Sequence, residues 1–196
     1  YVNTFRNALQ QVTSTEIVRA QKKTPVSIWV ASMDFTKELS EKVKWEFGVK
    51  GISSDLDNDV LVENEQNGEF IADPELSENS NLSEDISALY SSFEFEINNK
   101  TKLKMGLRYE YTDTELNTLT EQKIVDLTYS DLFPTLYFSR EVTKETTIIL
   151  SYGRRINRPS FNDLAPFVVF LDPNTFFFGN TALQPSRTNN LKLDLK

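Results

Sequence analysis

The chain has 196 residues, no cysteine, no histidine and a formal net charge of −8. The absence of cysteine excludes a disulfide framework and a thiolate metal site, and the absence of histidine removes the commonest general base and metal ligand. We therefore expect no metal site, no cofactor and no enzyme in this portion of the protein. Apolar runs are only a few residues long, which excludes a helix that crosses a membrane.

The first strong pattern is a predicted hairpin in the N-terminal quarter. Apolar and polar residues alternate from Val26 to Phe35, with a change of phase after Val30 that indicates a bulge or a change of environment. A polar turn is predicted at 36–42. Strict alternation then resumes from Val43 to Gly51. Two alternating segments joined by a short polar link predict a β-hairpin.

The range 53–85 is predicted to be a long, mobile, acidic loop. It holds 11 acidic residues and no basic residue, whereas the rest of the chain holds 21 basic and 18 acidic residues. The acidity therefore belongs to one segment and not to the whole fold. Within this segment, Asn67-Gly68 is a turn dipeptide and predicts a short hairpin.

Three carboxylates in this range imitate the start of a calcium-binding loop. Asp55, Asp57 and Asp59 have the spacing of the first ligands, but Val60 stands where the loop needs glycine and Gln66 where it needs glutamate. We therefore interpret the segment as a solvated acidic surface without a metal site.

The clearest strand signal lies at Thr101 to Thr112, where Leu103, Met105, Leu107, Tyr109 and Tyr111 alternate with mostly charged residues. Such a length is unusual for a soluble domain but suits a tilted strand that spans a bilayer, which needs about 9–11 residues. Further strands are predicted at Ile86–Ile97, at Leu132–Val142, at Thr146–Ile156 and from Leu191 onward. Pro134 predicts an end or edge position for its strand.

Short and long links alternate strictly along the chain. The short links are 36–42, 98–100 and 143–145, and the long links are 53–85, 113–130 and 157–186. In an up-and-down antiparallel meander, this alternation places all short turns at one end and all long loops at the other, as in outer-membrane barrels. A soluble β-sandwich also alternates apolar and polar residues, but it usually has shorter strands and Greek-key connections. The predicted fold is all-β, a meander that forms part of a transmembrane barrel.

The segment Ser151 to Asn190 resembles the barrel of TonB-dependent receptor-like outer-membrane proteins of Bacteroidetes-type bacteria. The matching blocks are Ser151-Tyr152, Arg154-Arg155, Ile156 to Phe161, Asp163 to Phe167, Asp172 to Thr175, Gly179-Asn180 and Leu183 to Asn189. Thr181 departs from the pattern, because a proline often follows Gly-Asn in this family.

The resemblance implies a large barrel of about 22 strands with a plugged lumen. The chain then supplies about eight strands, and residues 1–196 form a partial barrel domain with neither the plug nor a closing strand. The implied location is the bacterial outer membrane. The implied partners are outer-membrane lipid and lipopolysaccharide, an energy-coupling inner-membrane protein acting through a missing N-terminal part, and an extracellular solute, but no nucleic acid.

The implied function is binding or import of that solute. The alternatives are a passive or structural barrel, such as a porin or adhesion scaffold, and an outer-membrane barrel enzyme.

The loop 157–186 and the outer end of the strand before it hold the candidate ligand-binding residues, and the four prolines of the loop predict a defined shape. Arginines suit anionic ligands such as lipopolysaccharide phosphates, and phenylalanines offer stacking surface. The alternative is structural: the arginines pair with Asp163, Asp172 or lumen carboxylates, and the phenylalanines pack into a loop core. The candidates are Arg154, Arg155, Arg158, Phe161, Asp163, Phe176 and Phe177.

Overall fold

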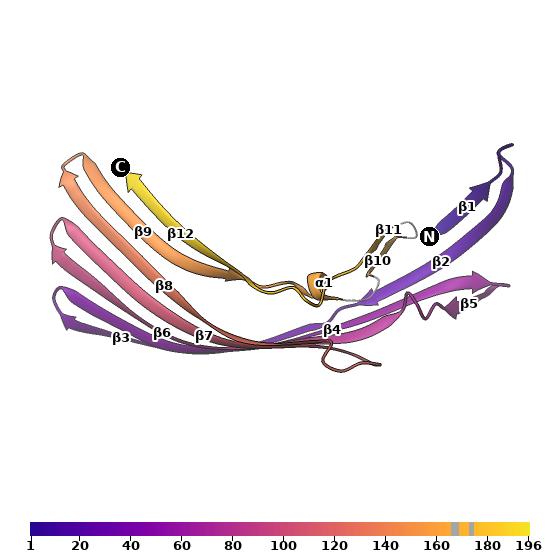
Figure 1. The fold of residues 1–196 in the computed structure, drawn as a ribbon, viewed down its shortest axis with the longest axis horizontal. Coiled ribbons are helices and arrows are strands. Elements are labelled where there is room, and N and C mark those ends of the chain that lie inside the picture. The colour runs from indigo at the N-terminus through magenta and orange to yellow at the C-terminus, as the bar shows by residue number, and fades with distance from the viewer. Residues whose placement is uncertain (166–168, 173–174) are drawn as a thin grey trace.

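A single curved antiparallel sheet forms the body of the protein (Figure 1). The structure is a computed structural model and describes residues 1–165, 169–172 and 175–196. The strands of the main path are, in spatial order, β1 (Val2–Arg6), β2 (Val12–Lys23), β4 (Val43–Gln66), β6 (Glu78–Asn98), β7 (Thr101–Thr118), β8 (Val125–Thr143), β9 (Thr146–Asn157) and β12 (Ser186–Leu195). Also paired with β4 are β3 (Val26–Ser40) and β5 (Glu69–Ala72).

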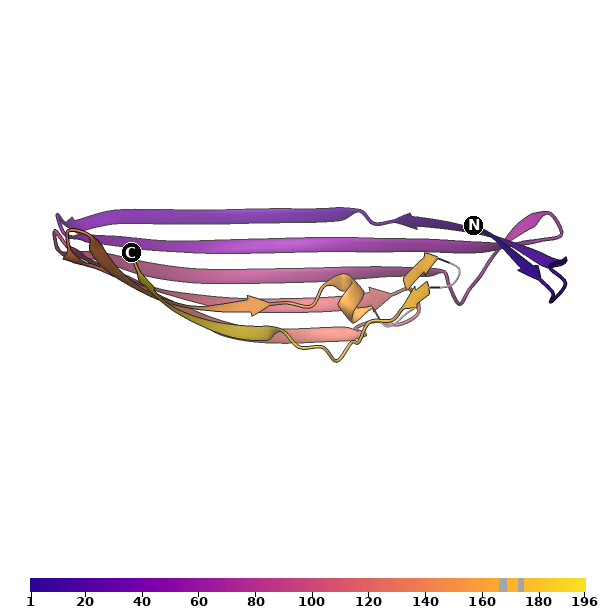
Figure 2. The ribbon, with the colours of Figure 1, turned by 90° about the horizontal axis from the view of Figure 1, so that it is seen from above.

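The loop between β9 and β12 carries the remaining elements. These are the short helix α1 (Phe161–Leu164) and a separate hairpin made of β10 (Val169–Asp172) and β11 (Thr175–Phe177). They lie over the concave side of the sheet (Figure 1). Seen from above, the long strands run side by side along the molecule, and the N- and C-termini lie toward opposite ends (Figure 2).

β2 and β3 together occupy one position in the sheet. β2 pairs with β4 from Asp59 to Asn64, and β3 pairs with the same strand from Val43 to Leu56. The break between them falls at Thr24 and Pro25, where proline has no N–H to donate to a ladder. The path β1-β2-β4-β6-β7-β8-β9-β12 therefore has eight positions, which confirms the predicted all-β meander of about eight strands.

The connections alternate between the two ends of the sheet, as predicted. The tight turns 41–42, 99–100 and 144–145 lie at one end, shown at the left of Figure 1. The connections 67–77, 119–124 and 158–185 lie at the other end. We refer to these as the turn end and the loop end.

Two of the three predicted long loops are mostly strand, so this part of the prediction is wrong. β4 continues to Gln66 and β6 begins at Glu78, so the acidic range 53–85 contains a regular ladder between these strands. β7 and β8 likewise extend into the range 113–130. Polar side chains on one face hid these strand extensions, because the backbone hydrogen bonds that hold a ladder do not depend on side-chain polarity.

The hairpin turn inside the acidic range is confirmed. Asn67 has φ 55° and Gly68 has φ 87°, and both values lie in the left-handed region. A two-residue turn with positive φ at both positions matches the right-handed twist of the flanking strands, and Asn-Gly is its preferred sequence. The turn joins β4 to β5.

Pro134 lies inside β8 and not near its start, because the strand begins at Val125. It pairs in register with Leu107 of β7. On the other side of β8, the ladder with β9 ends at Thr135, one residue away. A residue that lacks an N–H fits at the end of a ladder, so the proline marks where β9 separates from β8, although β9 stays paired with β12 up to Asn157.

The change of phase after Val30 reflects a change of environment. Pairing between β3 and β4 runs without a register shift from Val26 to Glu38, which excludes a bulge there. Between Val30 and the turn end, apolar residues point to the convex face. Between Val30 and the loop end, they point to the concave face, where Leu56, Leu82, Leu116 and Val125 share one row across four strands.

The convex face carries a continuous apolar band near the turn end. On β7 the band runs from Leu103 to Tyr111, a length that matches the ~9–11 residues of a strand that spans a bilayer. Met105 and Leu107 are 41% and 49% exposed although they sit in the middle of the sheet. Neighbouring strands continue the same rows with Trp45, Phe47, Val49, Leu89, Phe93, Phe95, Leu132, Leu136, Phe138, Leu150, Leu191 and Leu193.

The concave face at the same level is polar. Lys104 lies between two carboxylates, with its Nζ 3.1 Å from Glu46 Oε2 and 3.9 Å from Glu94 Oε2. The ring of Tyr90 lies against Gly48, where an added Cβ would come within 2.5 Å of ring atoms. An apolar outer face and a polar inner face are the reverse of a soluble protein and the rule for a barrel in a membrane.

Candidate functional site

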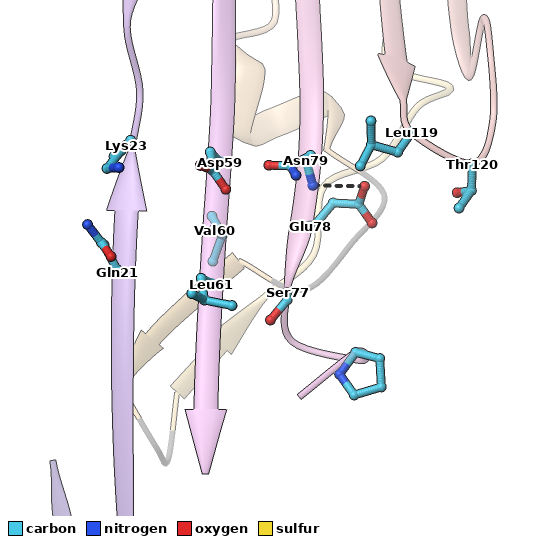
Figure 3. Close-up of a pocket in the computed structure, with 11 residues that line it drawn as sticks. Gln21, Lys23, Asp59, Val60, Leu61, Ser77, Glu78, Asn79, Leu119 and Thr120 are labelled. Atoms are coloured by element: carbon cyan, nitrogen blue, oxygen red, sulfur yellow. Dashed lines mark hydrogen bonds between the residues drawn. The ribbon is translucent and has the colours of Figure 1, made fainter. Parts of the chain in front are cut away.

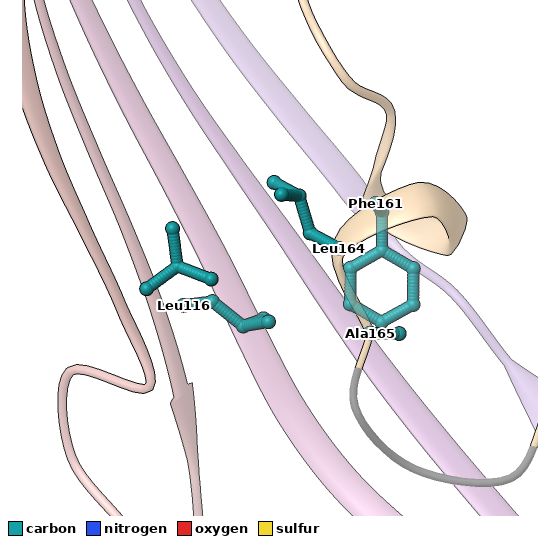
Figure 4. Packing of buried hydrophobic residues seen from close by; sticks show 5 residues of the cluster. Leu116, Phe161, Leu164 and Ala165 are labelled. Atoms are coloured by element: carbon teal, nitrogen blue, oxygen red, sulfur yellow. The ribbon is translucent and has the colours of Figure 1, made fainter. Parts of the chain in front are cut away.

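The loop 158–185 is folded onto the concave face at the loop end. Its helix presents Phe161 and Leu164, followed by Ala165, to a buried cluster completed by Leu116 and Val125 of the sheet (Figure 4). Phe161 is 8% exposed and Leu164 is 1% exposed. Burial of side chains of this size stabilises by about 1.5–3 kcal/mol each. The cluster therefore docks the loop on the row of apolar residues that the sheet extension provides.

Ser160 and Asp163 fix the start of the helix. Asp163 Oδ2 accepts hydrogen bonds from the Ser160 hydroxyl at 2.7 Å and from the Ser160 backbone N–H at 2.8 Å. These hydrogen bonds, the one from the hydroxyl first, lower the pKa of the Asp163 carboxyl from its ordinary value. Asp163 is thus part of the capping box at the start of α1, and its hydrogen bonds favour the charged carboxylate.

The returning arm of the loop is clasped to the same turn through Gly179 and Asn180. Their backbone N–H groups donate to Ala165 O at 2.7 Å and to Asp163 O at 2.6 Å. A Cβ added at Gly179 would lie 2.6 Å from Ala165 N and from Asp163 O, closer than real Cβ contacts. Only glycine allows the two arms to approach this closely.

Arg158 ties the base of the loop to the sheet. Its Nη2 donates to Glu110 Oε2 at 2.7 Å and to Thr112 Oγ1 at 3.1 Å, and its Nε donates to Tyr129 Oη at 2.9 Å. Glu110 is 8% exposed on the concave face. Burial disfavours the charge on Arg158, but hydrogen bonding to Glu110 and Tyr129 outweighs it and raises the pKa of the guanidinium. Arg158 and Glu110 therefore form a charge-assisted hydrogen bond that connects the loop to the sheet.

A second arginine repeats this tie at the other arm. Arg187 makes a bidentate pair with Asp131, through Nε at 2.6 Å and Nη2 at 2.8 Å. Arg154 Nη2 lies 3.6 Å from the same carboxylate. The guanidinium carbons of Arg158 and Arg187 lie 6.0 Å and 5.9 Å from the Tyr129 ring centroid, within range of a cation–π contact. Carboxylates of the sheet thus pair with the arginines at both ends of the loop, and the Tyr129 ring adds a cation–π contact to each.

The predicted candidates separate into two groups. Arg154, Arg158, Phe161 and Asp163 are engaged in the contacts described above, so the structural alternative accounts for them. The arginines pair with the concave-face carboxylates and not with Asp163, which bonds to Ser160.

Arg155 and Phe177 form the second group. Arg155 is exposed, and no described residue forms a hydrogen bond or ion pair with its guanidinium. Phe177 is 42% exposed, so at this residue the predicted packing into a loop core does not occur. The side chains of Phe167, Phe170, Asp172 and Phe176 lie outside the described part of the structure.

Sequence reasoning missed the partners on the sheet, namely Glu110, Thr112, Tyr129 and Asp131. Glu110 lies on the polar face of a predicted strand, Asp131 directly precedes the predicted strand Leu132–Val142, and the two are opposite each other in the register. Two acidic residues near the outer ends of their strands, where the arginine-rich segment also lies, could have predicted these ion pairs. Gly179 was recognised only as part of a family motif, because its close approach is a tertiary contact.

A hollow of about 390 Å³ with a mixed polar and apolar lining lies at the loop end, apart from these residues. Gln21, Lys23, Asp59, Glu78 and Asn79 line it (Figure 3). Burial raises the pKa of the Glu78 carboxyl, against a smaller opposing effect of a hydrogen bond from the Asn79 N–H. None of the predicted ligand-binding residues lines this hollow.

Asp55, Asp57 and Asp59 lie on the extended strand β4 and not in a loop that could surround a cation. Among the described residues, no group of three or more histidine, cysteine, aspartate or glutamate side chains is arranged to hold a metal ion. The described part of the chain also contains no helix of the length and hydrophobicity needed to cross a membrane.

A comparison with protein families matches the outer membrane protein beta-barrel family over residues 1–196. The chain belongs to this family. This outer-membrane barrel protein is therefore located in the bacterial outer membrane, and the apolar band of its convex face contacts lipid. No curated protein matches the chain. In outer-membrane barrels the short turns are periplasmic and the long loops extracellular, so the docked loop lies at the extracellular end of the barrel wall.

Proposed function

We propose that the chain is part of a TonB-dependent receptor-like transporter that binds or imports an extracellular solute, with the loop 158–185 as its ligand platform. The observation that supports this most is the docking of that loop on the concave face. An extracellular loop that is folded inward and held by Arg158 and Arg187 meets any solute that enters the barrel from outside. The blocks between Ser151 and Asn190 add the resemblance to that receptor family.

Two exposed residues are the proposed ligand contacts, one at the loop end of β9 and one in the loop 158–185. Arg155 offers a guanidinium that no described carboxylate neutralises, and Phe177 offers an exposed ring. A guanidinium suits an anionic group of a solute, and an exposed aromatic ring suits an apolar or planar group. Arg154, Arg158, Phe161 and Asp163 contribute by holding the platform in place, and Phe176 stays a proposed contact.

The rest of the barrel wall is part of the same proposal. In the described residues β3 pairs only with β4 and β12 only with β9, so one edge of each is open. Open strand edges do not occur in hydrocarbon, because unpaired backbone groups cost several kcal/mol each. We therefore expect further strands of a larger barrel to pair with both edges, and a plug and an energy-coupling segment to belong to the same transporter.

The test is uptake by the full-length protein in cells. Arg155→Ala and Phe177→Ala should each reduce uptake of the solute while the amount of folded barrel in the outer membrane is unchanged. Lys144→Ala, in a tight turn at the opposite end, is the matched control and should leave uptake at the wild-type level. Wild-type uptake in both Arg155→Ala and Phe177→Ala would contradict the proposed platform.

A passive pore is the second candidate, because a loop folded onto a polar inner face also narrows a diffusion channel. Energy dependence separates the two functions. Uptake through an energised receptor should stop when a protonophore dissipates the inner-membrane potential, whereas passive diffusion should continue.

A further inference from the structure

A shallow hollow interrupts the apolar band on the lipid-facing side of the sheet. Its floor is one row of three small residues on adjacent strands, Ala31, Gly51 and Ser87. Met33, Val49, Leu89 and Tyr109 form the next row toward the turn end, and Tyr111 continues the floor row on β7. The hollow therefore has a low floor beside bulky apolar walls.

Gly51 is the reason for the hollow. A Cβ built on Gly51 meets no heavy atom within 4 Å, and its φ is not in the left-handed region. Backbone conformation thus does not require glycine at this position. What glycine provides here is space on the outer surface.

The hollow lies at the extracellular margin of the band. The next row toward the loop end contains Trp29, Ser53 and Asp85, and the first and last of these flank a continuation of the hollow. Apolar side chains give way to carboxylates at this row, as expected where hydrocarbon meets the headgroup region. The hollow therefore opens to hydrocarbon on one side and to headgroups on the other.

We propose that this hollow is a binding site for one acyl chain of lipopolysaccharide. Three observations favour this occupant. The hollow is continuous with the surface that contacts lipid, its lining is mainly apolar, and it lies in the extracellular half of the band, where lipopolysaccharide forms the outer leaflet. An acyl chain that lies on Gly51 would fill the space between the bulkier side chains of the band. Trp29 and Tyr111 would lie beside it as interfacial aromatic residues.

The experiment measures lipopolysaccharide bound to the purified full-length protein in detergent, by native mass spectrometry during titration with purified lipopolysaccharide. Gly51→Leu fills the hollow with a side chain and should weaken binding of the most tightly held molecule by about tenfold or more. Ser87→Leu fills the same row and should do the same. Gly153→Leu is the control: Gly153 is also open to space but lies on β9 in register with Thr135 of the concave face, away from the hollow, and this variant should bind as the wild type does.

A difference in electrophoretic mobility between heated and unheated samples shows that each variant is folded. If Gly51→Leu misfolds, Ser87→Leu alone tests the proposal. Equal lipopolysaccharide binding by wild type and by folded variants with a filled hollow would overturn the proposal. Displacement of the bound lipopolysaccharide by an equal concentration of phosphatidylethanolamine would overturn it as well. A membrane protein that co-purifies with the wild type but not with Gly51→Leu would instead assign the hollow to a protein interface.

Discussion

At the scale of single residues, the alternation along β7 decides which side of the sheet meets lipid. Leu103, Met105, Leu107 and Tyr109 point to the convex face, and Arg158 reaches Glu110 on the other face. The period of two makes this assignment possible from sequence alone, because a one-residue slip would exchange all the side chains between the faces.

Leu107→Arg should destabilise the barrel by about 2–4 kcal/mol, because it places a charge near the middle of the hydrocarbon layer. Thr135→Arg is the control. Thr135 lies on the neighbouring strand opposite Gly106, is exposed on the concave face, and should tolerate the charge. Urea unfolding of both variants in lipid vesicles measures the difference. An unchanged stability of Leu107→Arg, or equal losses in both variants, would contradict the membrane position of the band.

Asp163 should make the stability of the loop decrease in acid. Its pKa is lower in the folded loop than in the unfolded chain, so its stabilising effect is complete above the ordinary carboxyl pKa of about 4. The effect is lost as the pH falls through the lowered pKa. Hydrogen-exchange protection of residues 160–165, corrected for the intrinsic exchange rate, should therefore decrease in acid.

Asp163→Asn is the control for this measurement, because the amide does not titrate. The variant should show weaker protection at neutral pH and little further decrease in acid. A wild-type pH profile in Asp163→Asn would mean that another group is responsible.

At the scale of the elements, the sequence identifies a strand well where one face is apolar and poorly where it is not. The segments around Trp45, Leu107 and Leu150 lie in the apolar band, and their alternation predicts them correctly. The extensions around Asp57 and Asp113 lie beyond the band, where the outward face meets water and carries carboxylates. There, only backbone pairing shows that the strands continue.

The loop 158–185 shows the same limit for the candidate site. Its prolines predict a defined shape, and the helix and the clasp at Gly179 bear this out for the described residues. Its place on the concave face depends on Glu110, Asp131 and Leu116, which are distant in sequence. Contacts of that kind do not appear in a local pattern.

Gly179→Ala should release the loop from the sheet. The added Cβ would collide with backbone atoms of Asp163 and Ala165, and overpacking of this kind costs about 1–3 kcal/mol. Limited proteolysis should cut within 158–185 faster in the variant while the sheet remains resistant. Gly153→Ala is the control, because its Cβ meets open space, and it should be cut at the wild-type rate. Equal cleavage of both variants would show that the clasp does not hold the loop.

At the scale of the whole molecule, the strict alternation of short and long links predicted the topology. Tight turns at 41–42, 99–100 and 144–145 fall at one end, as the alternation requires of a meander. The sequence did not predict that the strands extend far past the apolar band and present an apolar concave row to the loop. That row depends on register across four strands, including Leu56, Leu82, Leu116 and Val125.

The most direct test of the membrane-barrel account is an accessibility scan along β7 in the full-length protein reconstituted in lipid. Single cysteines, absent from the chain itself, carry spin labels at Leu103, Lys104, Met105, Leu107, Arg108 and Tyr109. Labels at the four apolar positions should collide with oxygen dissolved in the hydrocarbon. Labels at Lys104 and Arg108 should instead collide with a water-soluble nickel chelate. An absence of alternation, or apolar positions that are shielded from oxygen as in the core of a two-layer sandwich, would contradict the account.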